Sequence, residues 1–375
     1  MADEPQEFVP APEVVALRQA VRGHCRQVWD EAAVRAVSER AEPASDLWRA
    51  LGQELGVLGV TVPERWGGAG AGLVEAAAVA EELGEALVPL PFLSAMLAAR
   101  MLVDSGDEAA CAELLPGLCD GTRRFAVVAT GADGRWAASS VTAHQCSADW
   151  MLTGSAGSVV DASTATDLLV VAADGALFHV DPQGPGVIQT PIPTLDLTRS
   201  QSGVSLENAP ARLCGRADPA QAGNTATVLL AAELVGVTRA LLDMAVSYAR
   251  VRKQFGRPIG SFQAVQQRCA DMLVEFELAK SAAAHAAWTH DQGGDDPALA
   301  ASLAHVVVTD AARAVAKGAI QVLGGVAITW EQPAHLYFKR SVANAALWGG
   351  RAHRTRLAVM AVDTPTAHSE LTRLV

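Results

Sequence analysis

The chain has 375 residues, half of them hydrophobic, with 41 Asp and Glu against 29 Lys and Arg and a formal net charge of −12. This length allows two or three domains and a large core, and the acidic balance argues against nucleic-acid binding as a main task. No run of about 20 uncharged apolar residues is present, so we expect no membrane span and attribute the apolar excess to contacts with other subunits.

Helical periodicity dominates the chain from about residue 11 to residue 120. Apolar residues recur at three- and four-residue spacing over residues 14–28 and 44–58, and a further helix is predicted over 73–87. The glycine cluster at 67–72 lacks the GxGxxG spacing of a dinucleotide-binding loop and the strand that should precede it, so we interpret it as a turn. A helical domain is therefore predicted over residues 1–121.

The composition changes between about residues 122 and 215. Short apolar runs at 125–128, 168–173 and 176–180 are separated by Gly, Asp, Ser and Pro, which is typical of short strands. Helical patterns resume near residue 222 and continue to the end, with turns at 255–261, 292–297 and 324–333. This order of segregated helices and strands predicts an α+β fold, with a β domain over 122–221 and a helical bundle over 222–375.

Six cysteines are scattered among apolar neighbours without a CxxC pair, and the acidic N-terminus has no apolar signal core. These features predict reduced thiols in a cytoplasmic protein. There is no HExxH motif and no Cys/His cluster, so we predict no metal site.

Two motifs in the C-terminal region stand out, and the first of them carries more polar side chains than a plain helical hairpin needs. The Arg252 motif joins two predicted helices and reads Tyr248-Ala-Arg-Val-Arg252-Lys253-Gln254-Phe255-Gly256-Arg-Pro-Ile-Gly260-Ser-Phe-Gln263. The Gly–Gly motif reads Gln321-Val-Leu-Gly324-Gly325. On the residues alone, they could also be a solvated basic turn and a helix C-cap.

Both motifs resemble the segments of acyl-CoA dehydrogenases that contact the FAD of a neighbouring subunit. The resemblance covers the whole chain, including residues 55–68 and 81–84 in the N-terminal region, and it implies the family's three-domain plan, FAD as cofactor and an acyl-CoA substrate. Glu81 and Glu82 are expected to be solvated helix charges. The cofactor contacts that the resemblance implies are Arg252, Gln254, Phe255 and Gln263 in the first motif, and Gln321, Gly324 and Gly325 in the second.

The implied reaction, α,β-desaturation of an acyl-CoA thioester, needs a carboxylate base near the α carbon. The two positions that carry this base in the family match Gly349 and Ala226 here, and neither is a carboxylate. Glu233 lies seven residues after Ala226, on the same helix face and about 10 Å along the axis. Its apolar neighbours predict a raised pKa, which makes it a candidate base. The alternative is a structural Glu that pairs with an Arg or caps an interface.

The β domain departs from the family in the segments that flank the flavin ring. The usual Thr-Glu-Pro-x-x-Gly-Ser-Asp motif has lost its Glu-Pro and Gly-Ser-Asp between Thr130 and Trp136, and the later Trp-x-Thr/Ser strand is not recognisable at residues 157–161. We therefore expect the half-site that holds the flavin ring to be lost and the half-site offered to a neighbouring subunit to be kept.

This asymmetry predicts the base-lacking subunit of an α2β2 heterotetramer with a paralogous acyl-CoA dehydrogenase. The segment Thr329-Trp330-Glu331 with His335-Leu-Tyr337 resembles actinobacterial members that act on steroid side-chain CoA thioesters. Two alternatives stay open: a self-sufficient homotetramer that uses Glu233 as base, and a non-catalytic assembly or acyl-CoA-binding subunit without flavin.

Overall fold

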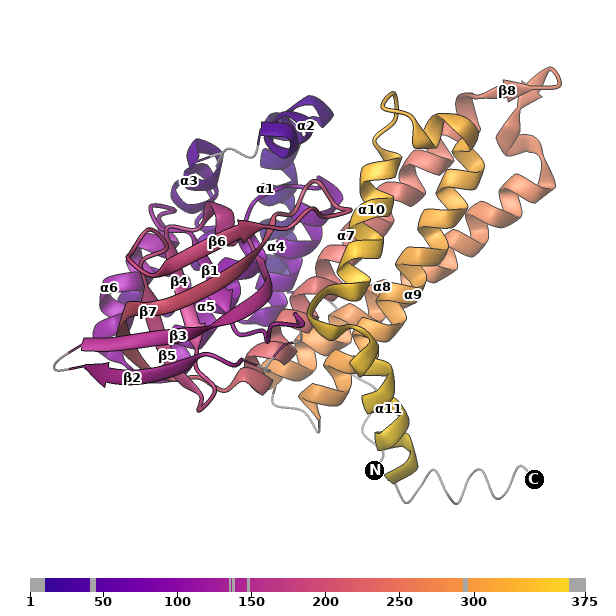
Figure 1. Cartoon of the computed structure of the whole chain (residues 1–375). Coiled ribbons are helices and arrows are strands. Elements are labelled where there is room, and N and C mark those ends of the chain that lie inside the picture. Colours follow the sequence, from indigo (N-terminus) through magenta and orange to yellow (C-terminus); the bar gives the residue numbers. More distant parts are fainter. Residues whose placement is uncertain are drawn as a thin grey trace.

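The computed structural model describes residues 11–40, 45–134, 136, 139–146, 149–292 and 296–363. The acidic N-terminal segment, Ala44 of the helix predicted over 44–58, and the end of the predicted bundle beyond residue 363 lie outside the described residues. A helical region, a β-sheet and a long helical bundle follow one another along the chain (Figure 1). The predicted α+β fold class is therefore confirmed.

The helical region before the sheet has α4 and α5 at its buried centre. The helix predicted over 44–58 ends earlier, at Gln53, because Gly56 has a φ of 67° and turns the chain. The helices are α1 (Pro12–Val28), α2 (Glu31–Arg40), α3 (Ser45–Gln53), α4 (Leu73–Glu85), α5 (Phe92–Ser105) and α6 (Glu108–Cys119), with 3₁₀ turns η1 (Val57–Gly59) and η2 (Glu64–Trp66).

The sheet has the strand order β1-β4-β5-β7-β3-β2, and β6 pairs with β7. Only β1 and β4 run parallel among the described strands, and the other neighbours are antiparallel. Helix α5 packs against β1 and β7. The strands are β1 (Phe125–Val128), β2 (Thr142–Cys146), β3 (Asp149–Val160), β4 (Asp167–Val171), β5 (Ala176–Val180), β6 (Val187–Pro191) and β7 (Gln201–Arg216), and the 3₁₀ turn η3 (Ala162–Thr164) follows β3.

The bundle is organised around α7, which packs against α4, α8 and α9. Asp218 caps α7 by accepting hydrogen bonds from the backbone N–H of Ala220 (2.8 Å) and Gln221 (3.2 Å). The elements are α7 (Pro219–Val251), α8 (Gln263–Gln292), α9 (Pro297–Leu323), α10 (Ala334–Ala346), α11 (Arg351–Asp363), the short strands β8 (Lys253–Gln254) and β9 (Arg257–Pro258), and the 3₁₀ turns η4 (Ile259–Ser261), η5 (Gly324–Ile328) and η6 (Leu347–Gly349).

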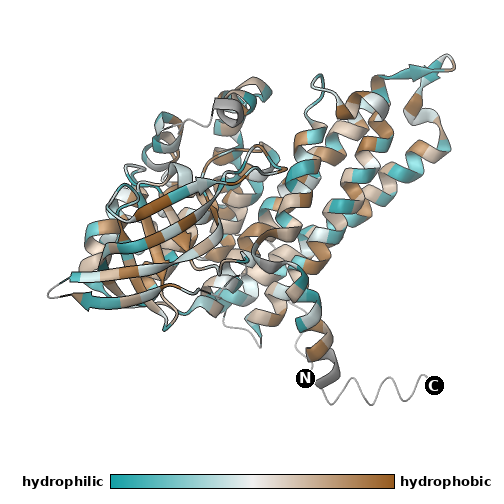
Figure 2. Cartoon of the chain, viewed as in Figure 1, coloured by the Kyte–Doolittle hydropathy of each residue, from teal (hydrophilic) through white to brown (hydrophobic). Residues whose placement is uncertain are grey.

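Two stretches of the bundle, α7 and α9 with η5, are long and apolar enough to cross a membrane by length and composition. In α7, 94% of the apolar window is buried inside the molecule, and in the second stretch 56% is buried. A helix at the centre of a large bundle has this composition because it meets other elements on most of its faces. Hydrophobic and hydrophilic residues alternate along the bundle helices, whereas β8 and β9 at the bundle tip are hydrophilic (Figure 2).

Helices α4 and α7 approach each other closely because glycine lies at their contact. A Cβ atom on Gly236 would lie 1.9 Å from the carbonyl oxygen of Glu81. The expectation that Glu81 and Glu82 are solvated is wrong: they are 5% and 1% exposed. Arg239 of α7 forms ion pairs with both carboxylates: its Nη1 lies 3.0 Å from Glu81 Oε1 and its Nη2 lies 3.1 Å from Glu82 Oε2. These ion pairs hold α4 against the bundle.

Candidate functional site

The Arg252 motif forms an exposed, internally bonded turn at the tip of α7 and α8. The Arg252 N–H donates to the Tyr248 carbonyl (2.9 Å), and the Ile259 N–H donates to the Arg252 carbonyl (2.8 Å). Phe255 is 91% exposed and has a φ of 53°. Arg252 and Lys253 form no salt bridge with a carboxylate in the described part of the chain. The backbone of this turn is thus ordered, while its cations are available to an anionic ligand.

The Gly–Gly motif ends α9 and begins η5. The Gly324 N–H donates to the Ile320 carbonyl, so this glycine is a helix C-cap as well. Its φ is 71°, and no atom lies within 4 Å of a Cβ built on Gly324 or Gly325. A ligand could therefore approach this backbone closely.

The fold brings the two motifs to the same end of the bundle (Figure 1). A Cβ on Gly318 of α9 would lie 2.7 Å from Sδ of Met272 on α8, which fixes the pairing of these antiparallel helices. Gln263 lies at the start of α8 and Gln321 in the last turn of α9, both exposed. Guanidinium and amide donors at the same end of the bundle as open glycine backbone fit a pyrophosphate group, and the exposed Phe255 ring fits an aromatic cofactor.

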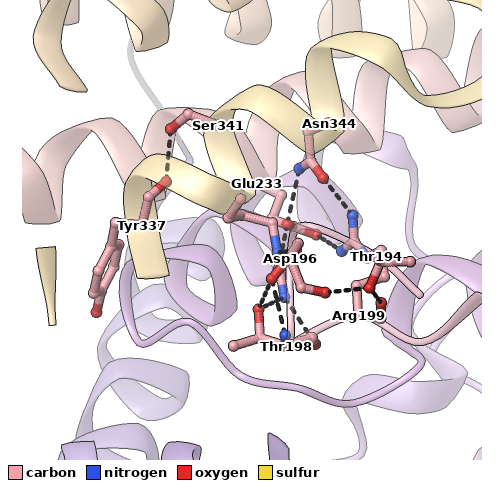
Figure 3. Close-up of polar contacts among 9 residues, drawn as sticks. Thr194, Asp196, Thr198, Arg199, Glu233, Tyr337, Ser341 and Asn344 are labelled. Carbon is pink, nitrogen blue, oxygen red and sulfur yellow. Dashed lines mark hydrogen bonds and ion pairs between the residues drawn. The ribbon is translucent and has the colours of Figure 1, made fainter. Parts of the chain in front are cut away.

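Glu233 is held in a buried network of charges (Figure 3). The prediction that it lies in an apolar site is therefore wrong. Its Oε1 accepts hydrogen bonds from Arg340 Nη1 (2.7 Å) and Asn344 Nδ2 (3.1 Å), and its Oε2 accepts one from Arg199. Burial alone would raise the pKa of Glu233, but the charges and hydrogen bonds of Arg199 and Arg340 outweigh burial and lower the pKa to about 2.

A carboxylate with this pKa is a weak proton acceptor at neutral pH, and both of its oxygens already have donors. The structural alternative, a Glu paired with Arg, is the arrangement observed. We therefore no longer assign Glu233 as the catalytic base.

The network around Glu233 joins the β domain to the bundle. Arg340 of α10 is 1% exposed and pairs with Asp196, which lies between β6 and β7. Its Nη2 also donates to the Thr198 carbonyl (3.0 Å), while Arg199 Nη1 donates to Asn344 Oδ1 (2.8 Å). Sequence reasoning missed these partners; the signal was the charged pair Asp196 and Arg199 within an otherwise uncharged stretch.

The two positions that carry the base in the resembled family, Ala226 and Gly349 here, lie near the first turns of α7. Ala226 is 2% exposed on α7, and Gly349 lies in η6 directly after Trp348. The rings of Trp348 and Trp136 pack edge to face with centroids 5.5 Å apart. Trp136 therefore brings the β domain against the segment that carries the base in the resembled family.

Trp136 is fixed by two further contacts. Its Nε1 donates to the Pro219 carbonyl (2.6 Å), and a Cβ on Gly223 would lie 2.8 Å from its ring. Counting from Thr130 along Thr-Glu-Pro-x-x-Gly-Ser-Asp places Trp136 at the Ser of that motif. A bulky indole thus occupies the space that a small hydroxyl side chain would leave open.

No group of three or more His, Cys, Asp or Glu side chains is arranged to hold a metal ion within the residues that the structure describes. The six cysteines all lie in that part of the chain, and none is paired. Burial raises the pKa of Cys25 to about 12 and that of Cys214 to about 11, so these thiols are weak nucleophiles.

Comparison with known proteins agrees with this geometry. The family models of the acyl-CoA dehydrogenase N-terminal and C-terminal domains match residues 11–122 and 222–362. Acyl-CoA dehydrogenase IpdE2 of Mycolicibacterium smegmatis is 35% identical over 335 residues, which cover 89% of this chain and 93% of that protein.

Two solved structures are similar over nearly the whole chain. The ChsE4-ChsE5 complex from Mycobacterium tuberculosis matches with a TM-score of 0.87 at 30% identity, covering 96% of this chain and 100% of that one. A variant of the Tcur3481-Tcur3483 steroid ACAD matches with a TM-score of 0.83 at 30% identity, covering 94% and 98%. The resemblance seen in the sequence is confirmed, and the chain belongs to the acyl-CoA dehydrogenase family of FAD-dependent oxidoreductases.

Proposed function

We propose that this chain is one subunit of an α2β2 acyl-CoA dehydrogenase that desaturates a steroid side-chain CoA thioester. The paralogous partner subunit supplies the catalytic base and the pocket for the flavin ring. This chain supplies the exposed donors of the Arg252 and Gly–Gly motifs to the FAD of the partner.

The observation that carries the proposal is the contact between Trp136 and Trp348. It brings together the two segments that in the family flank the flavin ring and provide the base, and there the rings pack against each other. Ala226 cannot accept a proton, and Glu233 is engaged by two arginines. By contrast, Arg252, Phe255 and Gln321 stay exposed.

The similar proteins support the partner and the substrate class. One similar structure is described as a complex of two differently named chains, ChsE4 and ChsE5, and another as a steroid ACAD named for two chains. A chain of this fold with one intact half-site suits the same kind of assembly.

The roles of the residues follow from their chemistry. FAD, when bound, accepts a hydride from Cβ of a thioester whose α proton a carboxylate removes. Arg252 would hold the cofactor phosphates by charge-assisted hydrogen bonds, and Gln263 and Gln321 would donate amide hydrogen bonds. Gly324 and Gly325 would let the cofactor lie against the backbone.

The test is to purify the chain alone and after co-expression with candidate paralogous subunits, then to measure flavin content and turnover of steroid and straight-chain acyl-CoA thioesters. We expect one FAD for each pair of unlike subunits. Turnover by the chain alone should lie at least about 100-fold below that of the complex, since loss of a general base costs about 10²–10⁴-fold.

Three outcomes would contradict the proposal. Robust turnover by the chain alone that is lost in Glu233→Gln, while that variant stays folded, would restore the homotetramer with Glu233 as base. Two FAD molecules per pair of unlike subunits would mean that the ring half-site of this chain is open. A stable complex without flavin would make the chain a non-catalytic assembly subunit.

A further inference from the structure

The segment that follows the Gly–Gly motif, Thr329 to His335, has no role in the site described above. Its second residue, Trp330, is 57% exposed, yet its indole lies among three side chains. The Arg35 guanidinium carbon is 5.1 Å from the ring centroid, the Lys339 ammonium nitrogen is 5.7 Å away, and the His335 ring meets the indole at right angles with centroids 4.7 Å apart. Two cations thus face one aromatic ring.

These contacts come from different parts of the fold. Arg35 lies on α2, where its Nε donates to Glu31 Oε1 (2.9 Å), and Lys339 and His335 lie on α10. Trp330 therefore connects the end of the Gly–Gly turn to the N-terminal helices and to the bundle. We call Trp330, Arg35 and Lys339 the indole clamp.

The turn between α9 and α10 needs an external anchor. Gly324 has a φ of 71°, and Gly325 has open space around it, so the glycines themselves allow several backbone paths. The Thr329 hydroxyl donates to the Val326 carbonyl (2.9 Å), and the Glu331 N–H donates to the Thr329 hydroxyl (3.3 Å). These bonds order the turn internally, while the indole clamp fixes it to α2 and α10.

His335 supports the indole from its buried side. It is 8% exposed, and its Nε2 has no hydrogen-bond partner among the described residues. Burial, followed by the charges of Lys339 and Arg35, lowers the pKa of His335. At neutral pH the ring is therefore uncharged, and the cations that face the indole are Arg35 and Lys339.

The clamped indole also forms one wall of a cavity beside the Gly–Gly motif. The cavity has a volume of about 610 Å³ and is lined by Trp330, Gln321 and Lys317 together with apolar side chains such as Ile328 and Phe338. Because Gln321 shares this cavity with Trp330, displacement of the indole changes the space next to a proposed cofactor contact.

We propose that Trp330 is a positioning residue for flavin binding: the indole clamp holds the Gly–Gly turn in the conformation that meets the FAD of the partner subunit. This inference rests on the proposed function, since the flavin concerned is the one held between unlike subunits. It also links α2, an element distant in sequence, to the retention of the cofactor.

The test uses the co-expressed complex with Trp330→Leu, and its readouts are the FAD dissociation constant, the assembly mass and the thermal midpoint. We expect FAD to bind on the order of tenfold more weakly, because two cation–π contacts are lost. The assembly mass should be unchanged, and the thermal midpoint should fall by only about 2–4 °C. Trp330→Phe should recover part of the affinity, and Arg35→Met and Lys339→Met should each give a smaller loss. Trp288→Leu, a change at a 38% exposed indole on α8, is the matched control.

The outcomes separate this inference from the proposed function. A flavin-containing wild-type complex whose affinity is the same in Trp330→Leu overturns the indole clamp alone. Equal losses in Trp330→Leu and Trp288→Leu also overturn it, because the effect would then not be specific to this indole. A wild-type complex without FAD overturns both.

Discussion

At the scale of single residues, Arg252 is a cation on an ordered, exposed turn without a carboxylate partner among the described residues. Arg252→Ala should leave the fold intact and weaken FAD retention in the complex. A lost charge-assisted hydrogen bond contributes about 1.5–3 kcal/mol, roughly a 10- to 100-fold change in affinity. Flavin titration monitored by fluorescence measures this change.

The matched control is Arg257→Ala on the same turn, because the Arg257 guanidinium already lies 4.3 Å above the Phe262 ring. This control should change flavin affinity less. Unaltered affinity in Arg252→Ala would remove Arg252 from the cofactor site.

Glu233 has a structural role that stability measurements can detect. Glu233→Gln leaves Arg199 and Arg340 buried with less opposing charge, so we expect the free energy of unfolding to fall by about 3–5 kcal/mol. The folded pKa of about 2 lies below the ordinary value of 4.5. Ionised Glu233 therefore stabilises the fold above about pH 4.5, and this contribution disappears as the pH falls from 4.5 toward 2.

Urea unfolding of wild type and Glu233→Gln across this pH range is the measurement. Glu331→Gln, a change at an exposed carboxylate, is the control and should be nearly neutral. Equal stability of all three proteins at pH 7 would show that the network around Glu233 does not stabilise the fold.

At the scale of elements, the contact between α9 and α11 depends on two histidines. The rings of His305 and His353 have centroids 4.4 Å apart, and His353 Nδ1 lies 3.2 Å from Ser302 Oγ. Burial lowers the pKa of both to about 4 from 6.5, and Arg354 and Arg356 on α11 contribute to the shifts. Asp310, which pairs with Arg354, acts in the opposite direction.

Both histidines are thus neutral in the folded protein, and acid must protonate them. Stability that is complete above about pH 6.5 should be lost as the pH falls from 6.5 toward 4. The protection of α11 amides in hydrogen exchange, expressed relative to the intrinsic exchange rate at each pH, should therefore fall over this range. A double His305→Asn, His353→Asn variant should show a flatter pH dependence. The same pH profile in both proteins would contradict this assignment.

At the scale of the whole molecule, the bundle exposes large apolar side chains on α8 and at its tip. Val274 is 60% exposed, Leu278 55% and Ile328 71%. Obligate interfaces commonly bury more than about 2,000 Å² in total, so we expect a tetramer with the partner subunit, formed mainly through residues 222–375. Light scattering of the chain alone and of the co-expressed complex measures its mass.

A charge at the interface should dissociate this assembly. We expect Val274→Asp to lower the assembly mass, whereas Ile188→Asp, at a 48% exposed position on β6, should leave it unchanged. A stable, flavin-free monomer under both expression conditions would refute the proposed assembly.

The sequence by itself determined the fold class, the family and several of the elements. Helices α1 and α4 and strands β1 and β5 were predictable because their apolar periodicity is local. The Arg252 and Gly–Gly motifs were recognisable in the sequence because each is a contiguous set of residues.

Only the tertiary structure decided the environments of the candidate catalytic residues. The neighbours of Glu233 in the sequence are apolar, but Arg199 lies 34 residues before it and Arg340 lies 107 residues after it. Trp136 and Trp348 likewise meet only after the sheet packs against the bundle. A pKa depends on the charges within a few ångströms, and those charges come from segments that the chain brings together only on folding.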